Sequence, residues 1–308
     1  MEQRALGRTG VEVSRLILGC GNFGGIGSSP AFFGMGETEP EAHALLDAAW
    51  EAGITAFDTA DAYGGGRSES FIGRWLASRG VRPVLTTKTF NPMSEGADRG
   101  LAPARIRRQL ETSLERLGVE RVDVYLAHAM DPETPIEETA AAFAALQEAG
   151  RIRAWGGSNV DAAWIEAARP AVVQNSYSLL ERDDAVLDLC AREGIGYAPF
   201  GPLAGGWLTG KYRRGAEPPA GSRMTLRPGP YRHLQTDRVF GALEALERAA
   251  ADRGTTPATL AFAWLLADPR VTAIVLGPRN RDHLRPALEA LQLDLAAAER
   301  DELSALFA

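Results

Sequence analysis

The 308-residue sequence has little of what marks secreted or membrane-spanning chains. It contains two cysteines, Cys20 and Cys190, which argues for a reducing compartment and against a disulfide framework. No apolar run approaches the length that crosses a bilayer, and the first ten residues, MEQRALGRTG, lack the apolar stretch of a signal peptide. We therefore expect a cytoplasmic protein without a membrane partner.

Basic residues and internal boundaries are also scarce. Lysine and arginine total 33 against 40 aspartate and glutamate, and the net charge of −7 argues against a nucleic-acid partner, which needs a basic surface. Any anionic ligand must then be held by local donors. No Gly/Ser linker, block of like charge or low-complexity tract divides the chain, so a single domain over residues 1–308 is expected.

The segment LGCGNFGG (18–25) contains a complete G-x-G-x-x-G pattern in Gly19, Gly21 and Gly24. In a Rossmann domain this pattern joins a strand to a helix whose N-terminus holds a pyrophosphate. Here it is followed by IGSSPAFFGMGE (26–37), and no helix can begin before about Thr38. The pattern therefore indicates a loop whose backbone passes close to a neighbouring group, and not a Rossmann turn.

Short apolar runs alternate with helix-patterned stretches along the whole chain. Helix signals include Thr38, Pro40 and Gly53 around one stretch, and Pro103 and Gly118 around another. Eight strand-helix units predict an α/β fold, a closed (β/α)₈ TIM barrel, with RALGRTGVEVS (4–14) as an N-terminal hairpin cap and an extra C-terminal helix. The eight runs are RLIL (15–18), ITAFD (54–58), PVLTT (83–87), VDVYLA (122–127), IRAWGGS (152–158), AVVQ (171–174), IGYAPF (195–200) and VTAIVL (271–276).

Four chemically active residues follow three consecutive predicted strands. Asp58 ends the second strand and Tyr63 lies just beyond it, while Lys88 and His128 end the third and fourth. In a barrel these positions face one mouth, where catalysis occurs. Taken singly, each has an ordinary interpretation: a turn cap, a loop aromatic, a solvated charge and a core histidine. Their joint placement favours an active site.

The four side chains suit proton donation to a carbonyl that is being reduced. A tyrosine with its ordinary pKa near 10 donates reluctantly at neutral pH. An adjacent ammonium, Lys88, is expected to lower the pKa of Tyr63, and Asp58 to fix the position of Lys88. A neutral His128 can donate a hydrogen bond to the substrate oxygen and so orient it.

With these residues in place, the sequence resembles an aldo-keto reductase over nearly its whole length. The matching segments are FDTADAYGGGRSESFIG, VLTTK, RVDVYLAHAMDPETPIEETAAAFAALQEAGRIRAWGGSN, VVQNSYSLLER, PLAGGWLTGKY and TPATLAFAWLLADPRVTAIVLGPRN. The resemblance implies a barrel that reduces an aldehyde or ketone with NADPH, or less often NADH, bound across its mouth. It also implies Tyr63 as proton donor, Lys88 and Asp58 as its tuning pair, and His128 as the group that orients the carbonyl.

The resemblance further implies a set of cofactor-binding positions. A first loop lies beside the nicotinamide, polar residues bind its carboxamide, an aromatic ring stacks on it, a segment runs under the pyrophosphate, and an arginine binds the adenosine 2′-phosphate. In that order the residues are Gly21, Asn22 and Phe23; Ser158, Asn159 and Gln174; Phe200; Gly201, Pro202, Leu203, Gly205 and Lys211; and Arg279 after Gly277, with His283 nearby. No metal ligands are predicted.

The sequence departs from the family pattern at four of these places. Gly201 replaces a serine, Leu276 a proline, and His283 and Ala287 a glutamine and an asparagine. The departures leave the catalytic residues intact but weaken the prediction of NADPH over NADH. Arg279 still favours NADPH, because a guanidinium fork binds a phosphate in two places.

The expected substrate pocket is apolar, and two rival functions stay open. Loops 23–37, 129–133 and 207–237 supply candidate lining residues that suit a bulky or aromatic carbonyl, or that merely pack on neighbouring helices. One rival is a lyase in which Lys88 forms a Schiff base. The other is a cofactor-sensing regulatory subunit, since the family includes potassium-channel partners. The candidate lining residues are Phe32, Phe33, Met130, Trp207 and Met224.

Overall fold

Eight parallel strands follow one another around a closed sheet in the computed structural model, which describes residues 1–308. Their order is β10-β3-β4-β5-β6-β7-β8-β9. The two edges meet because Thr272 and Val275 donate backbone N–H groups to the carbonyls of Tyr197 and Pro199, each at 2.9 Å. The predicted barrel is confirmed, and each predicted run overlaps one strand. The strands are β3 Leu16–Gly19, β4 Ala56–Asp58, β5 Val84–Thr89, β6 Val122–Ala127, β7 Ile152–Ser158, β8 Val172–Gln174, β9 Gly196–Tyr197 and β10 Ile274–Leu276.

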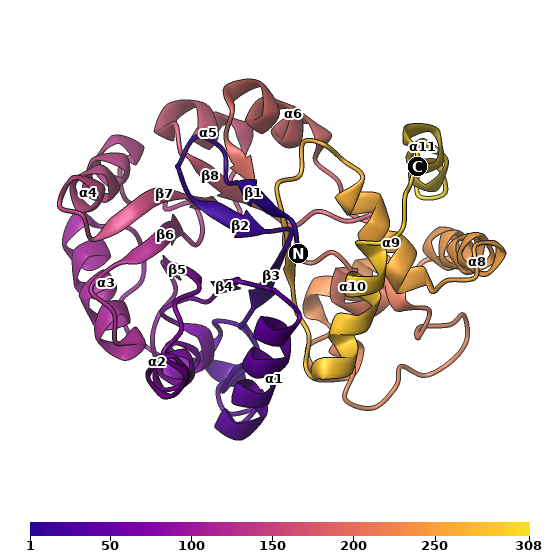
Figure 1. The fold of residues 1–308 in the computed structure, drawn as a ribbon, viewed down its shortest axis with the longest axis horizontal. Helices are drawn as coiled ribbons and strands as arrows, with labels where there is room; N and C mark the ends of the chain where they lie inside the picture. The colour runs from indigo at the N-terminus through magenta and orange to yellow at the C-terminus, as the bar shows by residue number, and fades with distance from the viewer.

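Helices surround this sheet (Figure 1). The predicted helix signals hold: Glu41 accepts the Thr38 backbone N–H at 2.8 Å to form a capping box, and Gly118 ends its helix at φ 67°. The α-helices are α1 Glu39–Glu51, α2 Arg67–Arg79, α3 Pro103–Leu117, α4 Ile136–Glu148, α5 Ala162–Ala168, α6 Asp184–Glu193, α7 Arg223–Leu226, α8 Asp237–Asp252, α9 Pro257–Leu266, α10 Arg285–Ala290 and the extra C-terminal α11 Ala297–Ala305. The 3₁₀ helices are η1 Pro30–Phe32, η2 Tyr63–Gly66, η3 Ala204–Thr209, η4 Gly229–Leu234 and η5 Arg281–Leu284.

The N-terminal hairpin closes one end of the barrel. Its antiparallel strands are β1 Gln3–Ala5 and β2 Glu12–Ser14, drawn in front of the barrel in Figure 1. Leu6, Val11 and Val13 are buried against the apolar side chains of the barrel interior. With this end plugged, only the opposite end, where the strands have their carboxyl termini, is left for a site inside the barrel.

A larger core lies between the sheet and the helices. Beside it, the buried side chain of Arg15 links the segment before β3 to the segment before β10. Arg15 donates to the carbonyls of Val271 at 2.8 Å, Thr272 at 2.6 Å and Leu266 at 2.7 Å. Burial lowers its pKa to about 10, so it stays charged at neutral pH. The apolar core cluster contains 66 buried residues drawn from all parts of the chain. That residues 1–308 form one domain stays a prediction.

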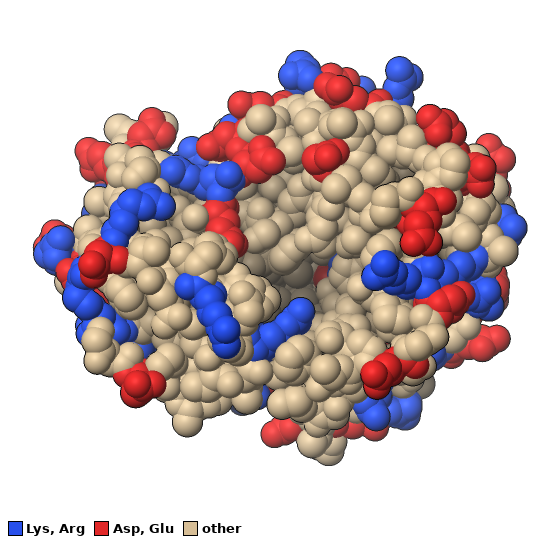
Figure 2. Space-filling model, turned by 180° about the vertical axis from the view of Figure 1, so that it is seen from behind, with Lys and Arg blue, Asp and Glu red and all other residues tan.

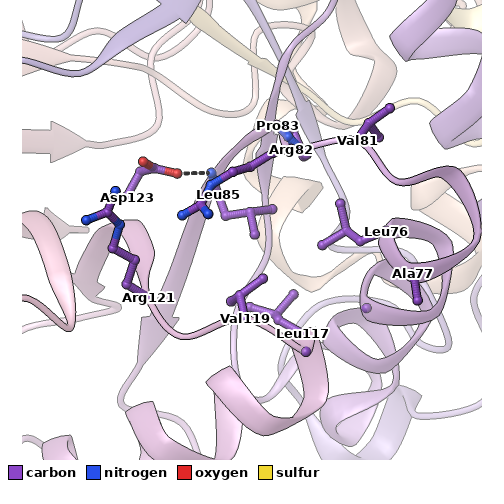
Figure 3. Close-up of a pocket in the computed structure, with 12 residues that line it drawn as sticks. Leu76, Ala77, Val81, Arg82, Pro83, Leu85, Leu117, Val119, Arg121 and Asp123 are labelled. Atoms are coloured by element: carbon purple, nitrogen blue, oxygen red, sulfur yellow. Dashed lines mark hydrogen bonds between the residues drawn. The ribbon is translucent and has the colours of Figure 1, made fainter.

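A hollow of about 310 Å³ lies at the outer side of the barrel, between α2, α3 and the starts of β5 and β6 (Figure 3). Its floor is apolar, with Leu76, Leu85 and Leu117, and Asp123 at its edge accepts the Leu85 backbone N–H at 2.9 Å. It contains none of the predicted site residues. In addition, none of the helices has both the length and the apolar composition needed to span a bilayer.

Candidate active site at the carboxyl ends of the strands

The structure brings the four predicted catalytic residues together. Asp58 is the last residue of β4, Tyr63 begins η2, Lys88 lies in β5, and His128 follows β6. Lys88 Nζ donates to Asp58 Oδ1, to the Thr59 carbonyl at 2.9 Å and to the Tyr63 hydroxyl at 3.4 Å. The rings of Tyr63 and His128 meet edge to face with centroids 5.4 Å apart.

Lys88 is held as an ammonium ion. Its side chain is 1% exposed, and its three N–H groups have three acceptors. Burial acts to lower the pKa of Lys88, but the nearby Asp58 and Tyr63 outweigh it, so the pKa is raised. The other Asp58 oxygen accepts from Gln174 Nε2 at 2.7 Å, which satisfies both oxygens of this carboxylate.

Tyr63 differs from the expectation. Burial raises its pKa, Lys88 lowers it, and Asp58 raises it again, so that the pKa lies above its ordinary value. The predicted effect of the lysine is present but smaller than the desolvation of the phenolate, because Asp58 neutralises much of the ammonium charge. Tyr63 is therefore a firmly protonated phenol with a cation 3.4 Å from its oxygen.

His128 is neutral. Burial lowers its pKa well below the ordinary value, and the charge of Lys88 adds to the effect. The side-chain amide nitrogen of Asn91 lies 3.2 Å from Nδ1. Donation by this amide makes Nδ1 an acceptor and leaves the ring proton on Nε2. Asn91 was not singled out from the sequence, although it is a polar residue shortly after a predicted strand end.

The residues predicted to bind a carboxamide border this cluster. Ser158 ends β7 and Gln174 ends β8; both side chains are buried. Asn159 adopts φ 56° and donates to the carbonyl of His128 at 2.9 Å. The structure thus places amide and hydroxyl groups next to Asp58 and His128.

The glycine pattern serves close packing. A Cβ on Gly19 would lie 2.4 Å from the carbonyl oxygen of Leu276, and Gly24, at φ 68°, packs against the side chain of Arg67. Gly21 faces the ring of Tyr63, with Asn22 and Phe23 buried beside it. The first α-helix begins only at Glu39, which confirms that no Rossmann turn is formed.

The remaining predicted cofactor residues lie on two loops farther out. Phe200 follows β9 and leads into Gly201, Pro202, Leu203 and Gly205, with Gly201 at φ 69° and Gly205 at φ 64°. Lys211 follows on an exposed stretch, and Gly277, Arg279 and His283 lie beyond β10, all exposed. None of them forms a hydrogen bond with the four catalytic side chains.

Two residues that were not singled out from the sequence, Glu37 and Arg223, connect loops around the mouth. Glu37 Oε1 accepts from Arg279 Nε at 2.9 Å, and Arg279 Nη1 also donates to the carbonyl of Gly221 at 3.0 Å. Arg223 in α7 donates to the side-chain oxygen of Asn22. No periodicity marks either pair, since the partners are 242 and 201 positions apart.

The mouth itself is a hollow with cations at its rim. The view of Figure 2, from behind Figure 1, looks onto the end opposite the hairpin and shows a central depression with blue Lys and Arg side chains around it. Of the predicted pocket residues, Met130 is 40% exposed, and Phe32 lies beneath Arg227, 5.3 Å from ring centroid to guanidinium carbon. Trp207 and Met224 belong to the buried core, which favours the alternative that they pack on neighbouring elements.

Residues 15–307 match the model of the Aldo/keto reductase family. The chain is 36% identical to an uncharacterized oxidoreductase of Bacillus subtilis (96% of this chain, 92% of the relative) and 33% identical to a probable voltage-gated potassium channel subunit beta of Oryza sativa (95% and 92%). The structure resembles that of a glycerol dehydrogenase from Gluconobacter oxydans, with a TM-score of 0.83 and 26% identity over 99% of this chain and 94% of the other.

Proposed function

The chain belongs to the aldo/keto reductase family, and on that premise we propose that it reduces an aldehyde or ketone to an alcohol with a nicotinamide nucleotide. The observation that carries the proposal is the contact of Lys88 Nζ with both Asp58 and the Tyr63 hydroxyl. A buried ammonium beside a protonated phenol is suited to giving a proton to an oxygen that gains negative charge.

The proposed chemistry divides among the four side chains. The nucleotide supplies the hydride when it is bound. His128, protonated on Nε2, donates a hydrogen bond to the carbonyl oxygen, and Tyr63 transfers its hydroxyl proton to that oxygen as negative charge develops. The tyrosinate that remains lies beside the ammonium of Lys88, which stabilises it until a proton returns from solvent.

The donor set around the mouth fits such a nucleotide. Ser158, Asn159 and Gln174 offer hydroxyl and amide groups for a carboxamide, and Phe200 offers an aromatic face. Lys211 and Arg223 are cations suited to phosphates, within a chain of net charge −7. Arg279 favoured NADPH on sequence grounds; because it is paired with Glu37, both NADPH and NADH are kept in the proposal.

The proposed substrate is a carbonyl compound with an apolar body. Phe32, Phe33 and Met130 border the mouth on loops, where they are partly or well exposed. The prediction of a cytoplasmic location and the absence of nucleic-acid and membrane partners stay predictions.

A regulatory role is the second candidate, because a relative of 33% identity is named as a potassium channel subunit. In that role the barrel would bind nucleotide and a channel without efficient turnover. The lyase alternative is weaker. A Schiff base needs a neutral amine, whereas Lys88 is buried, its pKa is raised, and all three of its N–H groups are engaged.

The decisive experiment follows nucleotide absorbance with a panel of aromatic and aliphatic aldehydes and ketones. The wild type is expected to oxidise NADPH or NADH, and Tyr63→Phe to lower kcat by about 10²–10⁴-fold while nucleotide binding persists. Tyr125→Phe is the matched control, since this tyrosine is buried away from the mouth with its hydroxyl bonded to the Ile106 carbonyl. Tight nucleotide binding without turnover on any carbonyl would favour the regulatory role.

A further inference from the structure

Glu37 is an unusual residue at the rim of the mouth. It is 5% exposed, and Oε1 accepts from Arg279, but Oε2 is buried without any hydrogen-bond partner. Burial raises the pKa of this carboxyl, and Arg279 and Arg223 act in the opposite direction. A buried acceptor oxygen without a partner is costly, and such groups call for an explanation.

The surroundings of Glu37 are cationic. Arg279 contacts it directly, and the charge of Arg223 acts on it as well. Burial and the charges of Arg223 and Arg279 lower the pKa of Lys211, which indicates that these three cations lie near one another. Glu37 is the carboxylate that pairs with Arg279. The pair uses Nε of the guanidinium, while Nη1 donates to the Gly221 carbonyl. Two of the five N–H groups of Arg279 are therefore already engaged, and its charge is paired with that of Glu37.

This arrangement distinguishes a hydroxyl from a phosphate. A hydroxyl can donate to the unpartnered Oε2, which removes the cost of leaving that oxygen unsatisfied. A phosphate offers acceptor oxygens and negative charge. It has to compete with Glu37 for Arg279, and it is repelled by a carboxylate in surroundings of low dielectric. General experience with nucleotide sites agrees: an acidic side chain accompanies a free ribose 2′-hydroxyl, and an unpaired arginine a 2′-phosphate.

We infer that Glu37 is a specificity-determining residue that favours a nucleotide with a free ribose 2′-hydroxyl over one with a 2′-phosphate. The inference rests on the proposed function, in which a nicotinamide nucleotide lies at this mouth with its adenosine end near Arg279. It reverses the preference that Arg279 alone suggested, since that arginine is neutralised by Glu37.

The test measures binding without any carbonyl substrate. The dissociation constants of NAD⁺ and NADP⁺ are determined by calorimetry for the wild type, Glu37→Gln and the control Glu39→Gln, in which the replaced carboxylate, at the start of α1, pairs with Arg74 of α2. The wild type is expected to bind NAD⁺ more tightly. Glu37→Gln keeps an acceptor for Arg279 but removes the charge, and should shift the NADP⁺-to-NAD⁺ ratio of dissociation constants about tenfold toward NADP⁺. Glu39→Gln should leave the ratio unchanged.

The possible outcomes distinguish the role of Glu37 from the proposed function. Binding of both nucleotides with the same ratio in wild type and Glu37→Gln overturns the role of Glu37 and leaves the proposed function standing. Failure of the wild type to bind either nucleotide overturns the proposed function itself. Should Glu37→Gln not fold, the wild type is titrated with ADP and with its 2′-phosphorylated form; tighter binding of the phosphorylated form by tenfold or more overturns the inference.

Discussion

Two groups of charged side chains border the mouth of the barrel, and they are held in different ways. Asp58 and Lys88 lie on neighbouring strands, are almost completely buried, and have every polar atom of the pair bonded. Glu37 and Arg279 come from two loops and Arg223 from the short helix α7 within a third, and the side chain of Arg279 is 40% exposed. The first group is fixed by the sheet, and the second by contacts between loops.

The strand-borne group is suited to chemistry, and the loop-borne group to recognition. A parallel ladder sets the spacing of strand-end residues to a fraction of an ångström, which proton transfer requires. Loops can change their residues without disturbing the sheet, which suits the choice of nucleotide and substrate. We therefore expect changes in the strand-borne group to cost stability, and changes in the loop-borne group to alter binding.

The largest effect on stability is expected for Asp58→Asn. This change leaves the Lys88 ammonium in a buried position without its counter-ion, so the free energy of unfolding should fall by about 3–5 kcal/mol in urea unfolding. Glu39→Gln, which breaks a pair exposed to solvent, should cost less than about 1 kcal/mol. Similar losses in the two variants would contradict the distinction between the groups.

A smaller, pH-dependent effect is expected at Asp61. This carboxyl accepts from Thr89 at 2.7 Å and from Gln109 at 3.0 Å, and burial together with the nearby Glu69 raises its pKa to about 7. The folded state then holds a proton that the unfolded state has lost, so this contribution to stability is present at low pH and disappears as the pH rises through about 7.

Urea unfolding from pH 5 to pH 8 checks this expectation. Between pH 5 and pH 6 the contribution of Asp61 declines by about 1.4 kcal/mol per pH unit, and Asp61→Asn should remove that slope. Glu39→Gln should keep it. Equal slopes in wild type and Asp61→Asn would show that the carboxyl is ionised in the folded state.

The smallest effect on stability is expected for Arg223→Met in the loop-borne group. Its guanidinium is only half-buried and has one hydrogen bond, to Asn22, so the free energy of unfolding should change by less than about 1 kcal/mol. Nucleotide binding should weaken about tenfold in calorimetry, because a cation is lost at the rim. Arg232→Met, an exposed arginine of η4, is the control for the loop and should leave binding unchanged.

The fold and the catalytic cluster were accessible from the sequence for a common reason. Alternating apolar runs and capped helices predict a barrel, and a barrel places successive strand ends at one mouth. Asp58, Lys88 and His128 could therefore be grouped from their positions at strand ends, and the structure brings them together with Tyr63.

The loops could not be predicted in this way. The pairing of Glu37 with Arg279 depends on how two irregular segments fold, and neither has a period to indicate it. Trp207 shows a related difficulty: an aromatic residue in a long loop suits pocket lining as well as packing, and here its ring packs on Tyr212 and Phe240. The pKa of Tyr63 is raised because the phenol is buried, and no sequence motif indicates that burial.

The buried contacts of Arg15 also constrain when the barrel can close during synthesis. Three carbonyls between Leu266 and Thr272 accept from this guanidinium, and β10 completes the sheet beside β3. A ribosome releases the chain from its N-terminus, so β3 waits with one edge unpaired and Arg15 without its acceptors until β10 has emerged. Until then the growing chain exposes an apolar strand edge. Most of the chain is synthesised between β3 and β10, so a chaperone that shields this edge has to stay bound during most of translation.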